Sequence, residues 1–429
     1  MVETIPPMTQ FRVVPQSNQL VHLVFDCPGR SMNVFSNTAI HELGAFAEWL
    51  HRNPVRGIVV RSGKASGFCA GADLSELGIA YDMIVSAPPA DRFDIAFDHF
   101  FPLSHAIRRL ETAGVPVAAA IGGLALGGGC ELALGCHYRA IANAPRARLG
   151  LPECAVGLLP GAGGTQRMPR LIGLDLGLEV LLQGRNLAGA AALEAGLVHE
   201  LVDDGAEVAA AEDWLLSPAA HAVQPWDRPG SSPAIHADYA AAIALHRARE
   251  LARMLGHEPA PLAILDCVEF GLMQPFDGAI RAEMSVFAQL IQRPEPRNMI
   301  RTMFLGKQAY DRADRSGATQ SRVVALATRA RDRIGELCGS FPGLARAGFG
   351  ALPEKAEPVQ NRVGEDFWIC GHPELLDSLR GFAEQFASAT RDLDEAERLQ
   401  LDYLLAHERT IPAYLGGLSG LSVKLGVHQ

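Results

Sequence analysis

The pattern of hydrophobic and polar positions predicts a chain that starts as strands alternating with helices. Residues 11–26 are predicted to form two short strands, because QLVHLVF alternates around a histidine before a Cys-Pro-Gly turn. Residues 37–51 have hydrophobic side chains at helical spacing, which predicts an amphipathic helix. Its apolar face comprises Ile40, Leu43, Phe46 and Leu50.

Three further apolar runs are typical of buried strands. They are GIVVRSG (57–63), VPVAAAIGG (115–123) and YRAIANA (138–144). Strand, turn and helix follow one another in this order, so the sequence predicts an α/β layer with buried strands.

The second half of the chain has a helical pattern. QPWDRPGSSPA (224–234) is rich in Pro and Ser and predicts an exposed loop or linker, and residues 236–310 are predicted to be helical. The expected division is a core domain in 1–205, a linker loop and C-terminal helical region of that domain in 206–311, and an extra, mainly helical module in 312–429.

Two features predict helices in the last module. Asp392 and Glu395 resemble a capping box that opens a helix. One stripe of hydrophobic side chains at helical spacing comprises Leu375, Leu379, Phe382 and Phe386.

Composition and charge narrow the class of protein. Hydrophobic residues make up 48% and charged residues 20% of the 429 residues, which is typical of a globular protein with a sizeable core. The formal net charge is −10 and no cluster of Lys and Arg stands out, so we expect neither a nucleic-acid partner nor an anionic membrane partner. Every apolar stretch is broken well before about 20 residues, so no membrane span is expected.

The cysteines predict neither a metal site nor a disulfide framework. The eight residues are scattered, with no CxxC pair and no zinc-like spacing with histidine. The first residues, MVETIPPMTQ, have no basic region followed by an apolar run, so no signal peptide is expected. We therefore expect reduced thiols and a cytoplasmic protein.

The segment SGFCAGADLSEL (66–77) is the first with candidate chemistry. Its small residues, among them Ala70, Gly71 and Ala72, follow a predicted strand and precede a polar helical stretch. Small side chains let a ligand approach the backbone, and free N–H groups there can bind an oxyanion. A plain strand-to-helix turn explains the same residues.

The second such segment is AIGGLALGGGCELALG (120–135). Three glycines, Gly127 to Gly129, precede Glu131 at the start of a predicted helix. The unpaired N–H groups and the positive end of the helix dipole suit a developing negative charge. The spacing matches neither a dinucleotide fingerprint nor a P-loop. Glu131 either takes part in chemistry or only complements the dipole.

The third segment, RLGLPECAVGLLPGAGGTQRMPR (148–170), has Glu153 in an apolar neighbourhood. Desolvation raises the pKa of a carboxyl group, so Glu153 is a candidate for moving protons near neutral pH, unless it is a glutamate of a surface turn. Together the three segments offer two backbone-amide sites and two carboxyl groups. Adding water across an activated carbon–carbon double bond requires this combination.

The sequence resembles the crotonase (enoyl-CoA hydratase/isomerase) superfamily over residues 10–310, and is most similar to the hydratase half of bifunctional fatty-acid oxidation proteins. The matching motifs, in family order, are CAGADL, ALGGGCELAL, GLPE, LLPGAGGTQRMPR, QGRNLAGAAALEAGLV, QPWD and IRTMFLGKQ. The resemblance implies a spiral of ββα units followed by a C-terminal helical region. It also implies an acyl-CoA substrate with no other cofactor and no metal, a homo-oligomer, and a partner enzyme of β-oxidation.

The resemblance further implies roles for individual residues. The catalytic glutamates fall on Glu131 and Glu153, and the oxyanion hole falls on the N–H groups of Ala70 and Gly128. The backbone from Ala70 to Asp73 would line the pocket for CoA. In this hypothesis Glu153 protonates the α-carbon, while Glu131 orients the water and helps to deprotonate it.

Residues 312–429 depart from the bifunctional relatives, which continue into a Rossmann dehydrogenase domain. No strand followed by GxGxxG is found there, so no dehydrogenase activity is expected. The alternatives to a hydratase are an enoyl-CoA isomerase, a hydrolase or a retro-aldol lyase, or a non-catalytic CoA-binding partner. The arginines near the motifs are expected on a solvated face rather than at CoA phosphates: Arg108, Arg109, Arg167 and Arg170.

Overall fold

The computed structural model describes residues 4–231, 237–254, 257–316, 321–341, 344, 349–350 and 373–427. The chain forms two compact units. The first comprises Met1–Cys154, Leu159–Ala242 and Ala263–Gln292, and the second comprises Ala155–Leu158, Ile243–Leu262 and Arg293–Gln429. The expected boundary at residue 312 lies inside α13 (Lys307–Arg315), and the division into domains stays a prediction.

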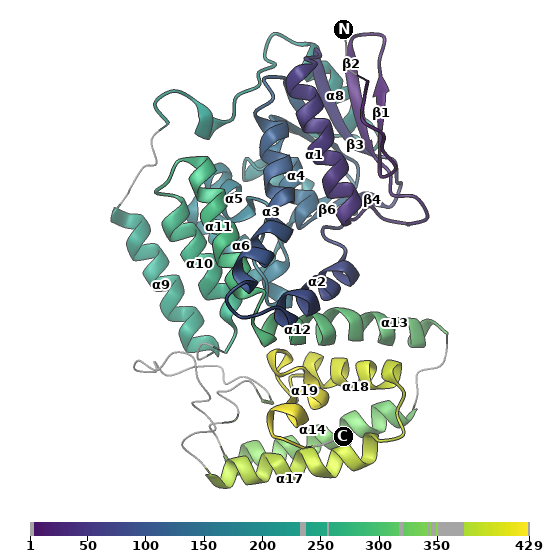
Figure 1. The fold of residues 1–429 in the computed structure, drawn as a ribbon, viewed down its shortest axis with the longest axis vertical. Helices are drawn as coiled ribbons and strands as arrows, with labels where there is room; N and C mark the ends of the chain where they lie inside the picture. Colours follow the sequence, from purple (N-terminus) through teal and green to yellow (C-terminus); the bar gives the residue numbers. More distant parts are fainter. Residues whose placement is uncertain are drawn as a thin grey trace. The chain divides into compact units, whose positions relative to one another are not determined.

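The first unit contains two sheets (Figure 1). The larger has the order β1 (Phe11–Pro15), β2 (Leu20–Phe25), β3 (Gly57–Ser62), β5 (Val117–Ile121), β7 (Tyr138–Ala142) and β10 (Glu200–Val202). Only the β1–β2 pairing is antiparallel among these described strands. The smaller has the order β4 (Gly67–Cys69), β6 (Leu124–Leu126), β8 (Arg148–Gly150) and β9 (Asn186–Ala188), with β9 antiparallel to β8.

From β3 to β8, consecutive strands alternate between the two sheets, and a helix follows each pair. β3 and β4 precede α2 (Leu74–Ser86) and α3 (Arg92–Glu111), and β5 and β6 precede α4 (Gly128–Gly135). β7 and β8 precede the 3₁₀ turn η1 (Glu153–Val156) and α5 (Gly164–Ile172). The predicted α/β fold with a spiral of ββα units is therefore confirmed.

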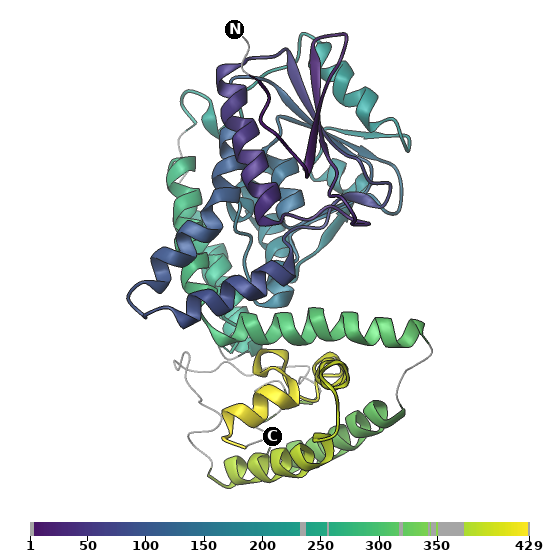
Figure 2. The ribbon, with the colours of Figure 1, turned by 45° about the vertical axis from the view of Figure 1, so that its right-hand side comes forward.

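Helices cover both faces of the larger sheet, which explains its continuous apolar strands. Alternate strand residues, such as Leu20, Val59 and Ala118, pack against Ala211 and Leu215. The last two belong to α8 (Glu207–Leu216). Figure 2 shows α8 in teal and α1 (Asn37–Arg52) in purple on opposite sides of the sheet.

The predicted amphipathic helix at 37–51 is confirmed as α1. It begins where the Ser36 side chain accepts a hydrogen bond from the Ala39 N–H at 3.3 Å, which satisfies one of the free N–H groups of the first turn. Its buried face includes Leu43, Phe46 and Leu50.

Several helices complete the description of the chain up to residue 292. They are α6 (Leu174–Gln183), α7 (Gly189–Glu194), the short η2 (Pro225–Asp227), α9 (Ala237–Met254), α10 (Pro259–Gly271) and α11 (Phe276–Leu290). α11 packs against α3 and α5. The predicted helical region is therefore confirmed, and the loop prediction at 224–234 falls partly outside the described residues.

All described elements from Arg293 onward are helical, as predicted. They are α12 (Pro294–Met299), the π-helix η3 (Ile300–Gly306), α13, α14 (Ser321–Ser340), α17 (Pro373–Thr390), α18 (Glu395–His407), η4 (Ala413–Leu415) and α19 (Gly417–Lys424). The predicted stripe of α17 is buried in a core of its own unit.

The capping box of α18 differs from the prediction by two residues. Asp394, not Asp392, accepts a hydrogen bond from the Glu397 N–H, and the Glu397 side chain accepts one from the Asp394 N–H. Asp392 instead forms an ion pair with Arg322. The spacing D-x-x-E occurs at both places, and pattern alone does not decide between them.

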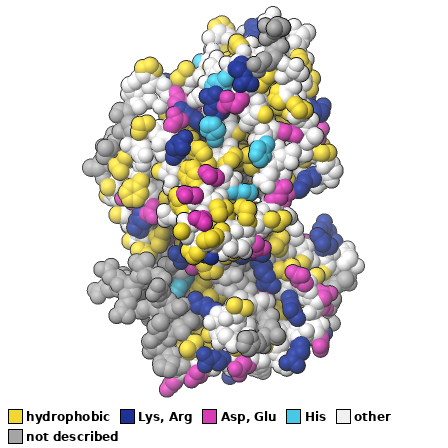
Figure 3. Space-filling view, in the orientation of Figure 1, with side chains coloured by type: hydrophobic (Ala, Val, Ile, Leu, Met, Phe, Trp, Pro, Cys, Tyr) yellow, Lys and Arg dark blue, Asp and Glu magenta, His cyan; other side chains and the backbone are white. Residues whose placement is uncertain are grey.

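Two further observations concern membrane-spanning helices and the distribution of surface charge. None of these helices is both long and apolar enough to cross a membrane. On the face that Figure 3 shows, basic and acidic side chains are interspersed.

Candidate active site

The smaller sheet brings the three predicted segments together. β4, β6 and β8 are neighbouring parallel strands. The carboxyl ends of parallel strands meet at one edge of a sheet, where α/β proteins commonly bind ligands. Ala70 follows β4, Gly127 follows β6, and Glu153 lies shortly after β8, so three successive turns of the spiral each contribute to one place.

The loops after β4 and β6 pack backbone against backbone. A Cβ atom added to Gly71 would lie 3.5 Å from Gly127 Cα and 3.6 Å from Gly128 N. Gly71 has a φ of 96° and Gly127 a φ of 52°, a region that favours glycine. The two glycines therefore permit both the turns and the close approach.

The Ala70 N–H does not have the predicted role in this structure. It donates a hydrogen bond to the Asn33 carbonyl at 2.9 Å, so it is not free to bind an oxyanion. The N–H of Ala72, two residues further, follows the turn at Gly71 and has no acceptor among the described residues. The loop thus offers the Ala72 N–H rather than the Ala70 N–H in this structure, and its role as an oxyanion site stays a prediction.

Gly128 is the first residue of α4, and its N–H is one of the amides that a helix leaves unpaired at its start. The positive end of the helix dipole is located here, which favours negative charge. Gly128 N lies beside Gly71, next to Ala72. The Gly128 and Ala72 amides thus belong to adjoining loops.

Asp73 ends the first loop by capping α2. Its carboxylate accepts a hydrogen bond from the Ser75 N–H at 3.0 Å and pairs with Arg30 at 2.5 Å. Its own N–H donates to the Phe35 carbonyl. Asp73 therefore fixes the course of the backbone from Ala70 to Asp73, whose role in binding CoA stays a prediction.

Glu131 is 2% exposed and lies in the first turn of α4. Its Oε1 accepts hydrogen bonds from the Ala162 N–H at 2.7 Å and the Gly164 N–H at 2.8 Å. Burial raises the pKa of Glu131 to about 7, although the two amides and the Arg167 charge oppose this shift. The group therefore titrates near neutrality while one oxygen is firmly held.

Glu153 starts the 3₁₀ turn η1 beyond β8. Burial is the main cause that raises the pKa of Glu153 well above its ordinary value, and the Glu131 charge adds to it. Its Oε2 is buried and has no hydrogen-bond partner among the described residues. Its Oε1 lies 2.7 Å from where a Cβ on Gly127 would be, so Glu153 contacts the glycine loop.

A third buried carboxyl group, Glu283 of α11, is fully buried and was missed by the sequence analysis. Burial raises its pKa to about 8, followed by the Glu131 charge. A buried face of α11 could be expected from its periodicity, but a glutamate on that face gives no local signal of a partner 118 residues away.

The arginine predictions are wrong for three of the four residues. Arg167 is fully buried and pairs with Glu111, and Arg108 bridges Glu111 and Asp227. Arg170 is part-buried and donates to the carbonyls of Gln166 and Gly271. Several acceptors surround each guanidinium, although burial still lowers the pKa of Arg170 to about 10.

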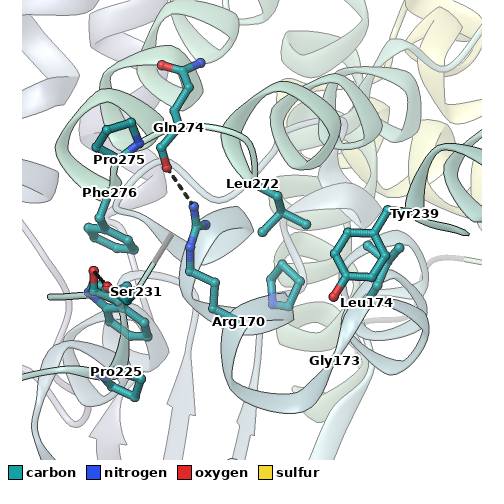
Figure 4. Close-up of a pocket in the computed structure, with 12 residues that line it drawn as sticks. Arg170, Gly173, Leu174, Pro225, Ser231, Tyr239, Leu272, Gln274, Pro275 and Phe276 are labelled. Carbon is teal, nitrogen blue, oxygen red and sulfur yellow. Dashed lines mark hydrogen bonds between the residues drawn. The ribbon is translucent and has the colours of Figure 1, made fainter. Parts of the chain in front are cut away.

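Arg170 also lines a cavity of about 340 Å³ (Figure 4). The other lining residues include Trp226, Tyr239 and Phe276. None of the predicted site residues lines this cavity, so it is separate from the candidate site.

Comparison with known proteins identifies the class. Residues 16–224 match the sequence profile of the family described as "Enoyl-CoA hydratase/isomerase". Residues 16–224 thus belong to that family, the crotonases.

The chain is also similar to particular curated proteins. It is 32% identical over 321 residues to the "Fatty acid oxidation complex subunit alpha" of Shewanella amazonensis, covering 74% of this chain and 44% of that protein. It is 34% identical over 277 residues to the protein of the same name from Idiomarina loihiensis, covering 64% of this chain and 38% of that protein. The chain thus spans less than half the length of these relatives.

Solved structures give partial matches. One is DspI of Pseudomonas aeruginosa, 28% identical with a TM-score of 0.42, covering 50% of this chain and 82% of that chain. Another is the enoyl-CoA hydratase of Bacillus anthracis, 23% identical with a TM-score of 0.43, covering 71% of this chain and 96% of that chain.

Proposed function

We propose that the site catalyses the reversible addition of water to a trans-2-enoyl-CoA, giving a 3-hydroxyacyl-CoA. The observation that supports it most is the pair of buried carboxyl groups, Glu131 and Glu153, whose pKa values are both raised. They adjoin the loop that starts α4, and membership of the family favours an acyl-CoA thioester as the substrate.

In the proposed reaction, the N–H groups of Ala72 and Gly128 bind the thioester oxygen. This lowers the energy of the enolate that forms when water attacks C3. The Glu131 carboxylate takes a proton from the attacking water, and protonated Glu153 gives a proton to C2. The Oε2 of Glu153 suits this role, because no group among the described residues competes for its proton.

The differing surroundings of the two carboxyl groups support this division of roles. Glu131 accepts two N–H bonds, which favour its charged form, whereas the negative charge of Glu131 disfavours ionisation of Glu153. An acid and a base in one site are usually two titratable groups whose surroundings separate their pKa values.

The metabolic role, partners and cofactors of the protein are part of the same proposal. The names of the curated relatives, each a subunit of a fatty acid oxidation complex, support a role in fatty-acid oxidation with a partner enzyme, while the homo-oligomeric form stays a prediction. The reaction as proposed uses the coenzyme A thioester and needs no other cofactor. Among the described residues, no group of three or more His, Cys, Asp or Glu side chains is arranged to hold a metal ion.

The purified chain tests the proposal when it is incubated with trans-2-enoyl-CoA thioesters of increasing acyl length. We expect the absorbance of the conjugated enoyl thioester to fall, with a product heavier by one water. A product of unchanged mass would indicate an isomerase, free CoA a hydrolase, and two smaller fragments a retro-aldol lyase. CoA binding without turnover of any chain length would favour a non-catalytic partner.

A further inference from the structure

Four consecutive N–H groups at the start of α5 are shared alternately between two buried glutamates. The Ala162 and Gly164 N–H groups donate to Glu131 Oε1 at 2.7 and 2.8 Å. The Gly163 N–H donates to Glu283 Oε1 at 2.7 Å, and the Thr165 N–H to Glu283 Oε2 at 3.0 Å. We call residues 162–165 the clamped loop.

The two glutamates come from different parts of the chain. Glu131 belongs to α4, and Glu283 belongs to α11, in the helical region that follows the spiral. Both are buried, at 2% and 0% exposure. The loop between them therefore has its backbone amides paired without water.

Side chains fix the Glu283 end of the clamped loop more tightly. The Thr165 hydroxyl donates to Glu283 Oε2, and Gln166 Nε2 donates to the Thr165 oxygen at 2.9 Å. Gln166 Nε2 also donates to the Cys267 carbonyl at 2.8 Å. Because Thr165 receives a hydrogen bond from Gln166, its own proton is directed toward Glu283.

The clamped loop has no room to shift sideways. A Cβ on Gly164 would lie 2.8 Å from Glu131 Oε1 and 2.7 Å from the Pro160 Cβ. A Cβ on Gly163 would collide with the Arg167 guanidinium. A shift of the clamped loop would therefore also move the Glu131 carboxylate.

We propose that Glu283 is a positioning residue of the proposed hydratase site. It holds the clamped loop in place, so that the N–H groups of Ala162 and Gly164 fix the Glu131 carboxylate. This inference rests on the proposed function. Glu283 touches neither the substrate nor the reacting atoms, and it acts through the loop and through its charge.

The charges around Glu283 define what its removal changes. The titratable and charged groups that face it are Glu131 of α4, Arg167 and Arg170 of α5, Glu153 of η1 and Cys267 of α10. The Glu283 charge helps to raise the pKa of Glu153, after burial and the Glu131 charge. Replacing it by a neutral group should therefore lower the pKa of Glu153. Loosening the clamped loop should instead raise the pKa of Glu131, because the Ala162 and Gly164 hydrogen bonds lower it.

The variant Glu283→Gln tests the proposal, because glutamine retains only one of the two acceptor oxygens that the loop amides need. We expect kcat for hydration to fall about 10- to 100-fold, since small misplacements of a catalytic group have effects of this size. KM should stay within about twofold, because the substrate is not contacted. The kcat–pH profile should narrow, its basic limb moving to lower pH with Glu153 and its acidic limb to higher pH with Glu131. A kcat and a profile equal to wild type would overturn the proposal.

Two threonine variants decide the question if Glu283→Gln does not fold. Thr165→Val removes one hydrogen bond to Glu283 and leaves the carboxyl group, and Thr165→Ser retains the hydroxyl as the matched control. We expect a lower kcat for the valine variant alone. Equal kcat values for the two variants would contradict the proposal. Glu194→Gln, an exposed glutamate of α7, controls for the loss of a charge in general.

A readout without turnover separates this proposal from the proposed function. Carboxyl groups labelled with ¹³C can be titrated by infrared or NMR spectroscopy, with Glu131→Gln used to assign the Glu131 signal. If the wild-type chain hydrates no enoyl-CoA, the proposed function fails. A higher midpoint for Glu131 in Glu283→Gln, from loss of the Ala162 and Gly164 hydrogen bonds, would then still support the positioning role, and an unchanged midpoint would refute it.

Discussion

At the scale of single residues, Glu131 and Glu153 differ in what holds them. One oxygen of Glu131 accepts two backbone N–H groups, whereas Oε2 of Glu153 is buried without a partner among the described residues. Burial raises the pKa of both groups. Their contrast in hydrogen bonding, rather than burial, is the basis for assigning one as base and the other as acid.

Glutamine at either position should abolish proton transfer while largely retaining the shape of the site. In Glu131→Gln the amide oxygen can still accept both N–H groups, and in Glu153→Gln the NH₂ group can replace the unpaired oxygen. We expect kcat to fall about 10²- to 10⁴-fold in each, the usual contribution of general acid–base catalysis. The enoyl-thioester absorbance assay measures this, with Glu194→Gln as control. Full activity in either variant would refute the assigned role.

The pH dependence of stability provides a test of Glu131 that is independent of turnover. Its pKa rises from 4.5 to about 7 on folding, so the folded protein binds this proton more tightly than the unfolded chain. The associated stabilisation is present below about pH 4.5 and is lost as the pH rises through about 7.

Glutamine at position 131 cannot lose a proton, so it avoids this loss. We therefore expect the melting temperature of Glu131→Gln, relative to wild type, to increase between about pH 5 and about pH 8. Thermal unfolding followed by circular dichroism measures the difference. A difference that is constant with pH would show that the pKa of Glu131 does not change on folding.

At the scale of elements, two loops make the candidate oxyanion site because each turns at a glycine with positive φ. Gly71 and Gly127 have φ values of 96° and 52°, and a Cβ added to either would lie 3.5 Å from the Cα atom of the other. The Gly127 turn starts α4, so the same residue positions the Gly128 amide and makes room for the Glu153 carboxylate.

Gly127→Ala should reduce activity far more than an alanine at another glycine with positive φ. Gly196 also has a positive φ, 75°, but has no atom within 4 Å of its added Cβ. Each substitution should cost about 1–3 kcal/mol in backbone strain. Only Gly127→Ala brings a methyl group against Glu153, so we expect about a 10²-fold loss of kcat/KM there and no loss in Gly196→Ala. Equal activities would contradict the proposed geometry.

At the scale of the whole molecule, the chain forms two compact units, and the second has a hydrophobic core of its own. Every residue of the candidate site, including Glu283, belongs to the first unit. The second unit has an internal ion pair, Arg301 with the buried Asp402, and a core to which Leu379 and Leu405 belong.

Leu379→Ala should therefore destabilise the protein and leave the chemistry unchanged. Leu379 is fully buried, and truncation of a buried leucine costs about 2–5 kcal/mol. We expect denaturant unfolding to report this loss, with kcat within about twofold of wild type at temperatures below the transition. Leu43→Ala, a fully buried leucine of α1, is the matched change in the first unit. A large fall of kcat in Leu379→Ala alone would show that the second unit contributes to catalysis.

The sequence determined those features of the protein that depend on neighbours along the chain. Hydrophobic periodicity predicted α1 and the stripe of α17, apolar runs predicted β3, β5 and β7, and a glycine-rich segment predicted the start of α4. These succeed because burial of one face and the conformational freedom of glycine are local properties. The motifs around Glu131 and Glu153 were found for the same reason.

Tertiary structure alone decided which backbone and side-chain groups are paired. Whether the Ala70 or the Ala72 N–H is free depends on Asn33, far away in sequence, and the buried pairing of Arg167 depends on Glu111 of α3. Glu283 acquires its partners only because α11 packs against α5. Hydrogen bonds of this kind are set by the position of an acceptor in space, which residue type and local pattern do not specify.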